Sequence, residues 1–388
     1  MIENIGMDEN KRPLTDPTTG AEIIEDAEQL DTALCMSGGG YRAMIFHLGT
    51  LLRLNEAGLL PKIDLFSSVS GGSITNGVLG LAWPKLNFDA NGVASNLGTL
   101  VVDKVRTLAD ETVDEESIVL GVLWFGTVSD RVAGAYDKYL FHGATLQELP
   151  DKPRFVFNAT NVQTRSLFRF SKPYAADYRI GLWMKPDLEI AKAVTASSAF
   201  PPVLSPCTVK VDEDAWEKEG RGPLCMKPYT TNLVLTDGGV YDNLGLESPW
   251  KRSKTIYVSD AGGATPAEAD PDENWVGHSK RVLDLVDTQV RSLRKRMLIQ
   301  AYKAKEKNGG YWGIRQDISE YKAPGRFEVP LDRSLALANT PTRLKKMNDT
   351  LQEQLINWGY AITDAALRSY PHPELPGPKG LPYPGSGI

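Results

Sequence analysis

Four short apolar segments of this 388-residue chain each run directly into a turn of small residues. The segments are 32–36, 64–69, 232–236 and 255–259, and the turns begin at Ser37, Ser70, Asp237 and Asp260. Helical patterns follow the first two segments, the first of them over 42–57. This alternation is typical of an α/β sheet with helices on its faces. Because ligands bind at the carboxyl ends of strands in open α/β sheets, we expect the functional site at these turns.

The body of the chain reads as a single domain. It contains no linker and no internal repeat, although its length alone is compatible with two or three domains. We expect an irregular lead-in over 1–31, one domain with helical additions over 32–370, and a tail over 371–388. The tail has six prolines and four glycines, so it cannot hold a helix or a central strand. Residues 154–162 and 166–171 predict a hairpin.

Composition excludes several classes of protein. Lys and Arg total 43 against 49 Asp and Glu, a net charge of −6, whereas a nucleic-acid-binding domain is strongly basic. Three scattered cysteines and four histidines without ligand spacing argue against a disulfide framework and a metal site. The N-terminal residues lack the apolar core of a signal peptide, and the longest apolar run, 118–125, is too short to span a bilayer. We expect a cytoplasmic protein with no metal, cofactor or nucleic-acid partner.

The glycine-rich turn Gly38-Gly39-Gly40 lies between a strand and a helix. Glycines there leave backbone N–H groups unobstructed, and at a helix N-terminus such donors form an anion site. One interpretation is an oxyanion hole. A second is a dinucleotide-binding loop, since Gly38 to Ala43 fits G-x-G-x-x-A, although the acidic residue expected at the end of the next strand is missing. A third is a purely structural tight turn.

Ser70 stands where a serine nucleophile would stand. It follows an apolar strand, precedes a helix and has Gly71 and Gly72 beside it, which resembles the G-x-S-x-G elbow with Ser68 in place of the first glycine. The alternative is that Ser70 or Ser73 merely caps the helix. A glycine-rich donor loop one strand away favours the nucleophile.

The base that would activate Ser70 is harder to assign. The late histidines, His278 and His372, follow no strand, while His47 and His142 favour structural roles, so a carboxylate becomes the candidate base. Asp237 and Asp260 both stand at strand ends before small residues. The pattern alone does not separate them, and each could equally be a structural aspartate in a turn.

Taken together, these motifs resemble the patatin-like phospholipases. The Gly38–Arg42 loop, Ser70 within S-x-S-G-G-S and Asp237-Gly238-Gly239 occur in that family's order, and 195–201 is similar to its A-S-x-A-x-P segment. The resemblance covers roughly 32–246. It implies a three-layer α/β/α sandwich with a mainly parallel central sheet. It also implies a Ser70–Asp237 dyad, which selects Asp237 over Asp260.

The resemblance further implies lipid acyl hydrolysis of the phospholipase A or lysophospholipase type. Gly38, Gly39 and Gly40 would form the oxyanion hole, and the supporting residues would be Arg42, Gly72, Gly238 and Gly239. Arg42 could brace the loop, meet a phosphate head group or form a surface ion pair. The alternatives are a general carboxylesterase for soluble short-chain esters or, in another class, a dinucleotide-binding protein. The expected partner is a lipid or ester substrate, and the sequence does not indicate an oligomeric state.

Two segments bear on contact with a membrane surface. The run 118–125 predicts a buried helix, or alternatively an acyl-chain pocket or docking lid. The predicted helix over 281–305 combines basic residues with a frame of apolar ones, which are Val286, Val290, Leu293, Met297 and Ala301. That spacing fits a core-facing apolar stripe with a solvated basic face. It also fits a helix lying on an anionic membrane, which would make the protein peripheral there.

Overall fold

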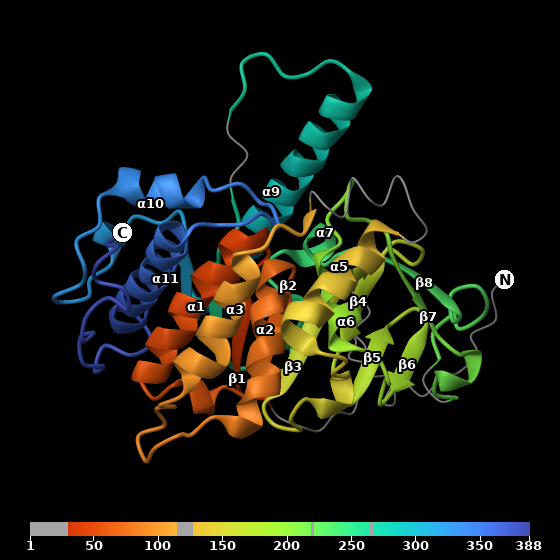
Figure 1. The fold of residues 1–388 in the computed structure, drawn as a ribbon, viewed down its shortest axis with the longest axis horizontal. Coiled ribbons are helices and arrows are strands. Elements are labelled where there is room, and N and C mark those ends of the chain that lie inside the picture. The colour runs from red at the N-terminus through yellow and green to blue at the C-terminus, as the bar shows by residue number, and fades with distance from the viewer. Residues whose placement is uncertain (1–29, 115–126, 219–220, 264–266) are drawn as a thin grey trace.

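The computed structural model describes residues 30–114, 127–218, 221–263 and 267–388. Its organising element is a ten-stranded mixed sheet in the order β10-β9-β1-β2-β3-β4-β5-β6, with β8 beside β3 and β7 beside β8 (Figure 1). The strands are β1 Thr32–Met36, β2 Leu65–Val69, β3 Arg154–Asn161, β4 Ser166–Phe170, β5 Tyr174–Asp177, β6 Gly181–Met184, β7 Cys207–Lys210, β8 Asn232–Asp237, β9 Thr255–Asp260 and β10 Asn308–Gly313.

The sheet has a parallel half and an antiparallel half that meet at β3. Strands β10, β9, β1, β2 and β3 pair in parallel, so their carboxyl ends lie along one edge. Strands β4 to β6 continue from β3 as antiparallel neighbours, and β7 pairs with β8 in the same sense. The predicted hairpin is confirmed, because β4 returns along β3.

Strands β2 and β8 meet end to end on the same side of β3. The last residue of β2, Val69, pairs with Asn158 of β3 in a parallel register. The next residue of β3, Ala159, pairs with Asp237, the last residue of β8, which runs antiparallel. The two carboxyl ends therefore face each other at consecutive positions of one strand. This places Ser70, the residue after β2, beside Asp237.

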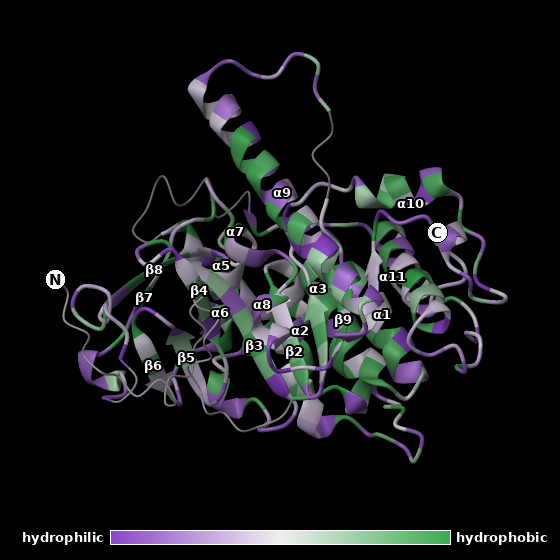
Figure 2. Ribbon diagram, turned by 180° about the vertical axis from the view of Figure 1, so that it is seen from behind, coloured by the Kyte–Doolittle hydropathy of each residue, from purple (hydrophilic) through white to green (hydrophobic). Residues whose placement is uncertain are grey.

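Helices cover both faces of the sheet. The helices are α1 Gly40–Glu56, α2 Gly71–Ala82, α3 Asp103–Ala109, α5 Val128–Tyr136, α6 Ile190–Ser198, α7 Gly239–Asp242, α8 Glu247–Trp250, α9 Trp275–Lys303, α10 Leu331–Ala338 and α11 Asp349–Ser369. Figure 1 shows α1, α2, α5, α6 and α11 on one face, and Figure 2 shows α8 and α9 on the other. Single turns of 3-10 helix lie at Leu60–Lys62, Trp83–Lys85, Leu146–Glu148, Glu213–Ala215 and Ile318–Glu320, and π-helical turns at Gly98–Val102 and Asp137–Phe141.

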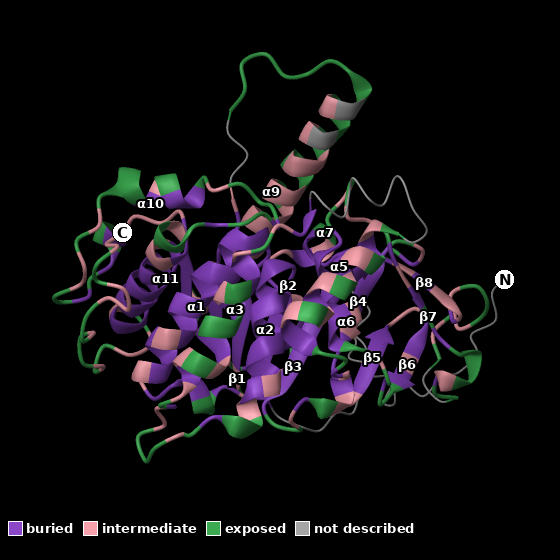
Figure 3. Ribbon diagram, in the orientation of Figure 1, coloured by how far each residue is buried: buried purple, intermediate pink, exposed green. Residues whose placement is uncertain are grey.

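The core lies between the sheet and the α1–α2–α11 layer, where strands and helices are buried almost throughout (Figure 3). One charged cluster is buried there: Asp364 of α11 accepts hydrogen bonds from Arg53 at 2.9 Å and from Arg368 at 2.7 Å. The C-terminal residues pack back onto this layer, since the Asn357 side chain binds the carbonyls of Tyr383 and Gly387. The tail is therefore docked against α11.

The predicted three-layer α/β/α class is confirmed, and two details differ from expectation. The sheet is mixed rather than mainly parallel, because each of the strands β4 to β8 pairs antiparallel with its neighbours. In α9, the predicted core-facing residues Val286 and Leu293 are 49% and 57% exposed, and only the C-terminal part of that frame, at Ala301, is buried. The apolar run 118–125 and most of the lead-in lie outside the described residues. Among the described helices, none is long and apolar enough to cross a membrane.

Candidate active site

Ser70 sits on a strained turn between β2 and α2. Its backbone has φ 52° and ψ −123°, a region that L-residues rarely adopt and that costs on the order of 1–3 kcal/mol. It occupies the N-cap position of α2, yet its side chain makes no capping hydrogen bond. The capping alternative therefore does not account for this hydroxyl. Gly71 is required beside it, because a Cβ there would lie 2.0 Å from the Gly40 carbonyl oxygen.

The serine that replaces the first elbow glycine has a structural role. Ser68 is fully buried, and its hydroxyl donates to the carbonyl of Val156 at 3.1 Å. The same oxygen accepts from the Asn76 amide at 2.9 Å and lies 2.9 Å from the Ser73 hydroxyl. Ser68 thus ties the end of β2 to the first turn of α2 and to β3.

Asp237 is a buried carboxylate with one oxygen held and one left open. Oδ1 accepts the N–H of Gly239 at 2.7 Å, whereas Oδ2 accepts no hydrogen bond. Burial raises the pKa of Asp237 to about 7, against the lowering effects of the Gly239 amide and the Ser70 side chain. A carboxyl with a pKa near neutrality suits a general base.

The end of α6 joins the two loops that carry Ser70 and Asp237. The Ser197 carbonyl accepts the N–H of Ser70 at 3.1 Å and that of Gly238 at 3.2 Å. The Ala199 carbonyl accepts the N–H of Asp237 at 3.0 Å. The segment 195–201 was recognisable in the sequence by its similarity to the family's A-S-x-A-x-P segment. Its residue types did not indicate that its backbone carbonyls would hold the two loops.

Two amides of the glycine loop have no hydrogen-bond acceptor among the described residues. Gly39 and Gly40 have φ of 146° and 59°, and their N–H groups donate to no acceptor within the described residues. Gly38 differs from expectation, because its N–H donates to the Asn243 carbonyl at 3.1 Å. A Cβ at Gly38 would lie 2.3 Å from the Asn243 side-chain oxygen and 3.0 Å from the Ser70 Cβ. Gly38 therefore leaves space beside Ser70, whereas Gly39 and Gly40 have N–H groups that are available as donors.

The start of α1 is partly covered by the chain. The Tyr41 amide donates to the Arg343 carbonyl at 3.0 Å, and a Cβ at Gly40 would meet the Arg343 backbone at 2.7 Å. A pyrophosphate at this helix N-terminus would need that amide. The geometry therefore disfavours the dinucleotide interpretation of the loop.

Arg42 is buried beneath the glycine loop instead of forming a surface ion pair. Its Nε donates to the Ala261 carbonyl at 3.1 Å and Nη1 to the Thr340 carbonyl, while Nη2 has no partner. Burial, and secondarily the charge of Arg291, lowers the pKa of Arg42 to about 10. The side chain borders the same cleft as Ser70, and it places a buried positive charge beside that cleft.

Asp260, the other candidate base, is fully engaged in its own loop. Its Oδ1 accepts the Gly262 amide at 2.8 Å, and its Oδ2 accepts the Tyr311 hydroxyl at 2.6 Å. Its role is therefore the bracing of the turn after β9. Asp260 is therefore the structural aspartate in a turn that the sequence allowed, whereas Asp237 has a carboxylate oxygen that accepts no hydrogen bond.

The histidines do not supply a base. His47 is fully buried between the Ser37 carbonyl and the Ser259 hydroxyl, each 2.9 Å away, and burial lowers its pKa to about 4. His142 and His278 are exposed, and His372 bonds Tyr257 at 2.7 Å. His142 ends the π-helical turn Asp137–Phe141 in the left-handed backbone conformation, which is consistent with the structural role expected for it.

Two cavities meet at Ser70. The larger, about 570 Å³, is polar and is bounded by the glycine loops, by Asp237 and by one side of α9. The smaller, about 280 Å³, has a mainly apolar wall formed by Pro201, Pro202, Val203, Leu204 and Leu344. Phe200 borders both. An ester bound at Ser70 would thus have a polar space on one side and an apolar space on the other.

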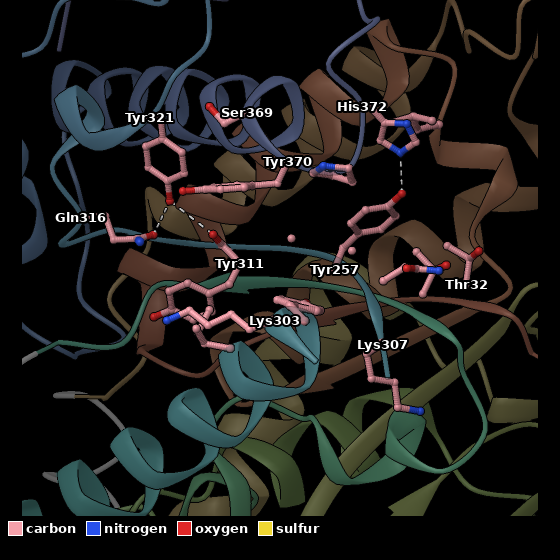
Figure 4. Close-up of a pocket in the computed structure, with 18 of the residues that line it drawn as sticks. Thr32, Tyr257, Lys303, Lys307, Tyr311, Gln316, Tyr321, Ser369, Tyr370 and His372 are labelled. Carbon is pink, nitrogen blue, oxygen red and sulfur yellow. Dashed lines mark hydrogen bonds between the residues drawn. The ribbon is translucent and has the colours of Figure 1, made fainter. Parts of the chain in front are cut away.

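A separate cavity of about 880 Å³ lies at the β10 edge of the sheet (Figure 4). Tyrosines and lysines line it, and their hydroxyls are largely bonded within the protein, as in the Tyr257–His372 and Tyr321–Gln316 pairs. Residues predicted for the active site are absent from its lining. No cluster of His, Cys, Asp or Glu among the described residues has the geometry to hold a metal ion.

Comparisons with known proteins agree with this fold. A family model described as patatin-like phospholipase matches residues 34–250, more than half of the chain. The structure of human GIVD cytosolic phospholipase A2 with methyl gamma-linolenyl fluorophosphonate matches with a TM-score of 0.51 and 16% identity over 88% of this chain and 58% of that one. A second structure of the human protein gives 0.52 and 14%, over 89% and 59%. No curated protein sequence matches significantly.

The mixed α/β sheet carries Ser70, on a strained turn, beside the buried Asp237. The chain belongs to the patatin-like phospholipase family. It spans less than two thirds of the length of the solved human phospholipase chains that it matches. At this level of identity, the structural likeness concerns the fold.

Proposed function

We propose that the protein hydrolyses carboxylic ester bonds of lipids, with Ser70 as the nucleophile and Asp237 as the base. The observation that carries this proposal is the meeting of β2 and β8 on β3. It brings a strained serine free of any capping bond next to a buried carboxylate with one open oxygen. Two free amides, of Gly39 and Gly40, complete the set of groups that acyl transfer requires.

The reaction follows from these groups. Asp237 takes the proton of the Ser70 hydroxyl as Oγ bonds to the ester carbonyl carbon. The Gly39 and Gly40 amides bind the oxyanion, and losing one such donor typically costs about 3 kcal/mol in the barrier. The carbon–oxygen bond to the alcohol then breaks, and Asp237 returns the proton to the leaving oxygen. Asp237 next deprotonates a water that attacks the acyl-serine. The bond between the acyl carbon and Oγ then breaks, Asp237 returns the proton to Oγ, and the acid is released.

The two cavities suggest how a phospholipid lies in the site. The apolar space beside Phe200 and Leu204 suits the acyl chain, because its burial there is favoured by the hydrophobic effect. The polar cleft suits the alcohol part, and the buried positive charge of Arg42 beside it favours a phosphate group there. This arrangement favours a phospholipase A or lysophospholipase over an esterase for soluble short-chain esters.

The test compares hydrolysis of a soluble short-chain ester and of phospholipid vesicles by the wild type, Ser70→Ala and Asp237→Asn. Both variants should lose at least 1000-fold in kcat for both substrates. Asp177→Asn is the matched control, because Asp177 is also a fully buried aspartate whose pKa burial raises, to about 6, yet it bonds Thr164 and Asn161 outside the cleft. It should keep wild-type activity once its fold is verified by circular dichroism.

Two results would change the proposal. Near wild-type turnover in Ser70→Ala or Asp237→Asn would refute the dyad. A wild-type preference for short soluble esters, with no rise in rate above the concentration at which the lipid aggregates, would replace the lipase by a carboxylesterase. A fluorophosphonate probe gives an independent readout, because it phosphonylates a reactive serine. It should label the wild type and Asp177→Asn, but not Ser70→Ala.

A further inference from the structure

Helix α9 presents its apolar residues to solvent. Its N-terminal part projects away from the sheet in Figures 1 and 2, and Figure 3 shows exposed residues along it. Trp275 is 81% exposed at the tip, and the large apolar side chains below it are also exposed. These are Val282 at 46%, Leu285 at 56%, Val286 at 49% and Leu293 at 57%. At 3.6 residues per turn, Trp275, Val282, Val286 and Leu293 fall on one stripe of the helix.

The opposite side of the same helix faces the catalytic cleft. Gly277, Arg281, Asp284, Thr288 and Arg291 line that cleft and follow a spacing of three or four residues. Arg291 donates to the Gly263 carbonyl at 2.5 Å, which ties this side of α9 to the turn after β9. The helix is therefore reversed relative to an ordinary surface helix: its charged side is turned into a cleft and its apolar side is turned to solvent.

Helix α9 is basic, whereas the chain as a whole is acidic. Its sequence contains seven basic and two acidic residues, in a chain whose net charge is −6. Arg281 pairs with Glu268, and Arg294 pairs with Asp242 and Glu247, and the helix keeps a positive excess after these three acids are counted. An exposed tryptophan and aliphatic residues on one face of a basic helix are the features of helices that lie in the interface of an anionic bilayer. The remaining positive excess is complementary to anionic lipid head groups.

We propose that the stripe formed by Trp275, Val282, Val286 and Leu293 docks the protein on a bilayer that contains anionic lipids. Because the other side of α9 bounds the cleft, docking sets the mouth of the active site against the lipid surface. This inference rests on the proposed lipid hydrolysis for its purpose. Its physical basis is the exposed apolar stripe and the charge of the helix.

The experiment measures binding to sedimenting vesicles of phosphatidylcholine with and without 30 mole per cent phosphatidylglycerol. The tested variant is Val282→Gln/Val286→Gln/Leu293→Gln, which keeps good helix formers on α9. We expect the wild type to bind the anionic vesicles at least tenfold more strongly than the neutral ones. The triple variant should lose at least tenfold in anionic-vesicle binding and in vesicle hydrolysis, while its kcat/KM on the soluble ester stays unchanged.

The matched control substitutes equally exposed apolar residues elsewhere, as Val162→Gln/Met184→Gln/Met226→Gln, whose wild-type side chains are 52%, 40% and 54% exposed. It should bind vesicles like the wild type. Equal binding by the α9 variant and the wild type would overturn the proposal. A wild-type dimer in light scattering that the α9 variant dissociates, with vesicle binding unchanged, would assign the stripe to a second copy instead. Both outcomes leave hydrolysis of the soluble ester intact, whereas failure of the proposed function would remove it from the wild type.

Discussion

Replacing Asp237 by asparagine should stabilise the protein at high pH and not at low pH. Burial raises the pKa of Asp237 from 3.8 to about 7, so the folded chain holds this proton over a range in which the unfolded chain has released it. Stability therefore falls as the pH rises from about 4 to about 7. At about 1.4 kcal/mol for each unit of pKa, the loss at pH 8 is about 4 kcal/mol. Asparagine has no such ionisation and avoids this loss.

The assay is thermal unfolding of the wild type and Asp237→Asn between pH 4.5 and 8.5. An unfolding entropy of about 2.1 cal/mol/K per residue makes 4 kcal/mol worth about 5 °C in Tm for a chain of this length. The cost of burying the new amide is the same at every pH, so only the change of the Tm difference with pH reports the ionisation. Asp187→Asn, at an exposed position, controls for loss of a charge. A Tm difference that stays constant, or that shrinks as the pH rises, would refute a raised pKa at Asp237.

Two further predictions follow from close contacts. Gly38→Ala should lower kcat by 10-fold or more, because its Cβ would meet the Asn243 side chain at 2.3 Å. Adding Asn243→Ala should restore part of the activity. Equal rates for the single and double variants would show that this contact is not the cause. Asp364→Ala should destabilise the protein by roughly 3–5 kcal/mol in denaturant unfolding, because it leaves the buried Arg53 and Arg368 without their carboxylate. A decrease in unfolding free energy below about 1 kcal/mol would show that water reaches the cluster.

The elements that carry the site were predictable because their signals are local. An apolar run that stops at small residues predicts both the strand and its end, and β1, β2, β8 and β9 begin and end within a residue or so of the predicted segments. The direction of β8 was not predictable, because the direction of a strand depends on how the connecting chain crosses the sheet. The choice between Asp237 and Asp260 depended on that direction. From the residues alone it therefore remained open.

Two other features depend on tertiary packing rather than on residue type. Ser197 contributes a backbone carbonyl that receives the amides of Ser70 and Gly238, and any residue possesses a carbonyl. The apolar frame of α9 has the same spacing as a core-facing stripe, so its exposure is decided by which side of the helix meets the cleft. The sequence pattern correctly predicted an amphipathic helix there. In the structure its apolar side faces solvent and its polar side faces the cleft.

The meeting of β2 and β8 on β3 has a consequence for how activity arises during folding. Ser70 and Asp237 are brought together by two strand pairings that are both distant in sequence, Leu65 of β2 with Arg154 of β3 and Asp237 of β8 with Ala159 of β3. The proposed dyad requires both pairings, and pairings distant in sequence form slowly. Recovery of turnover during refolding should therefore report the slower of these two pairings. It should lag behind the recovery of secondary structure.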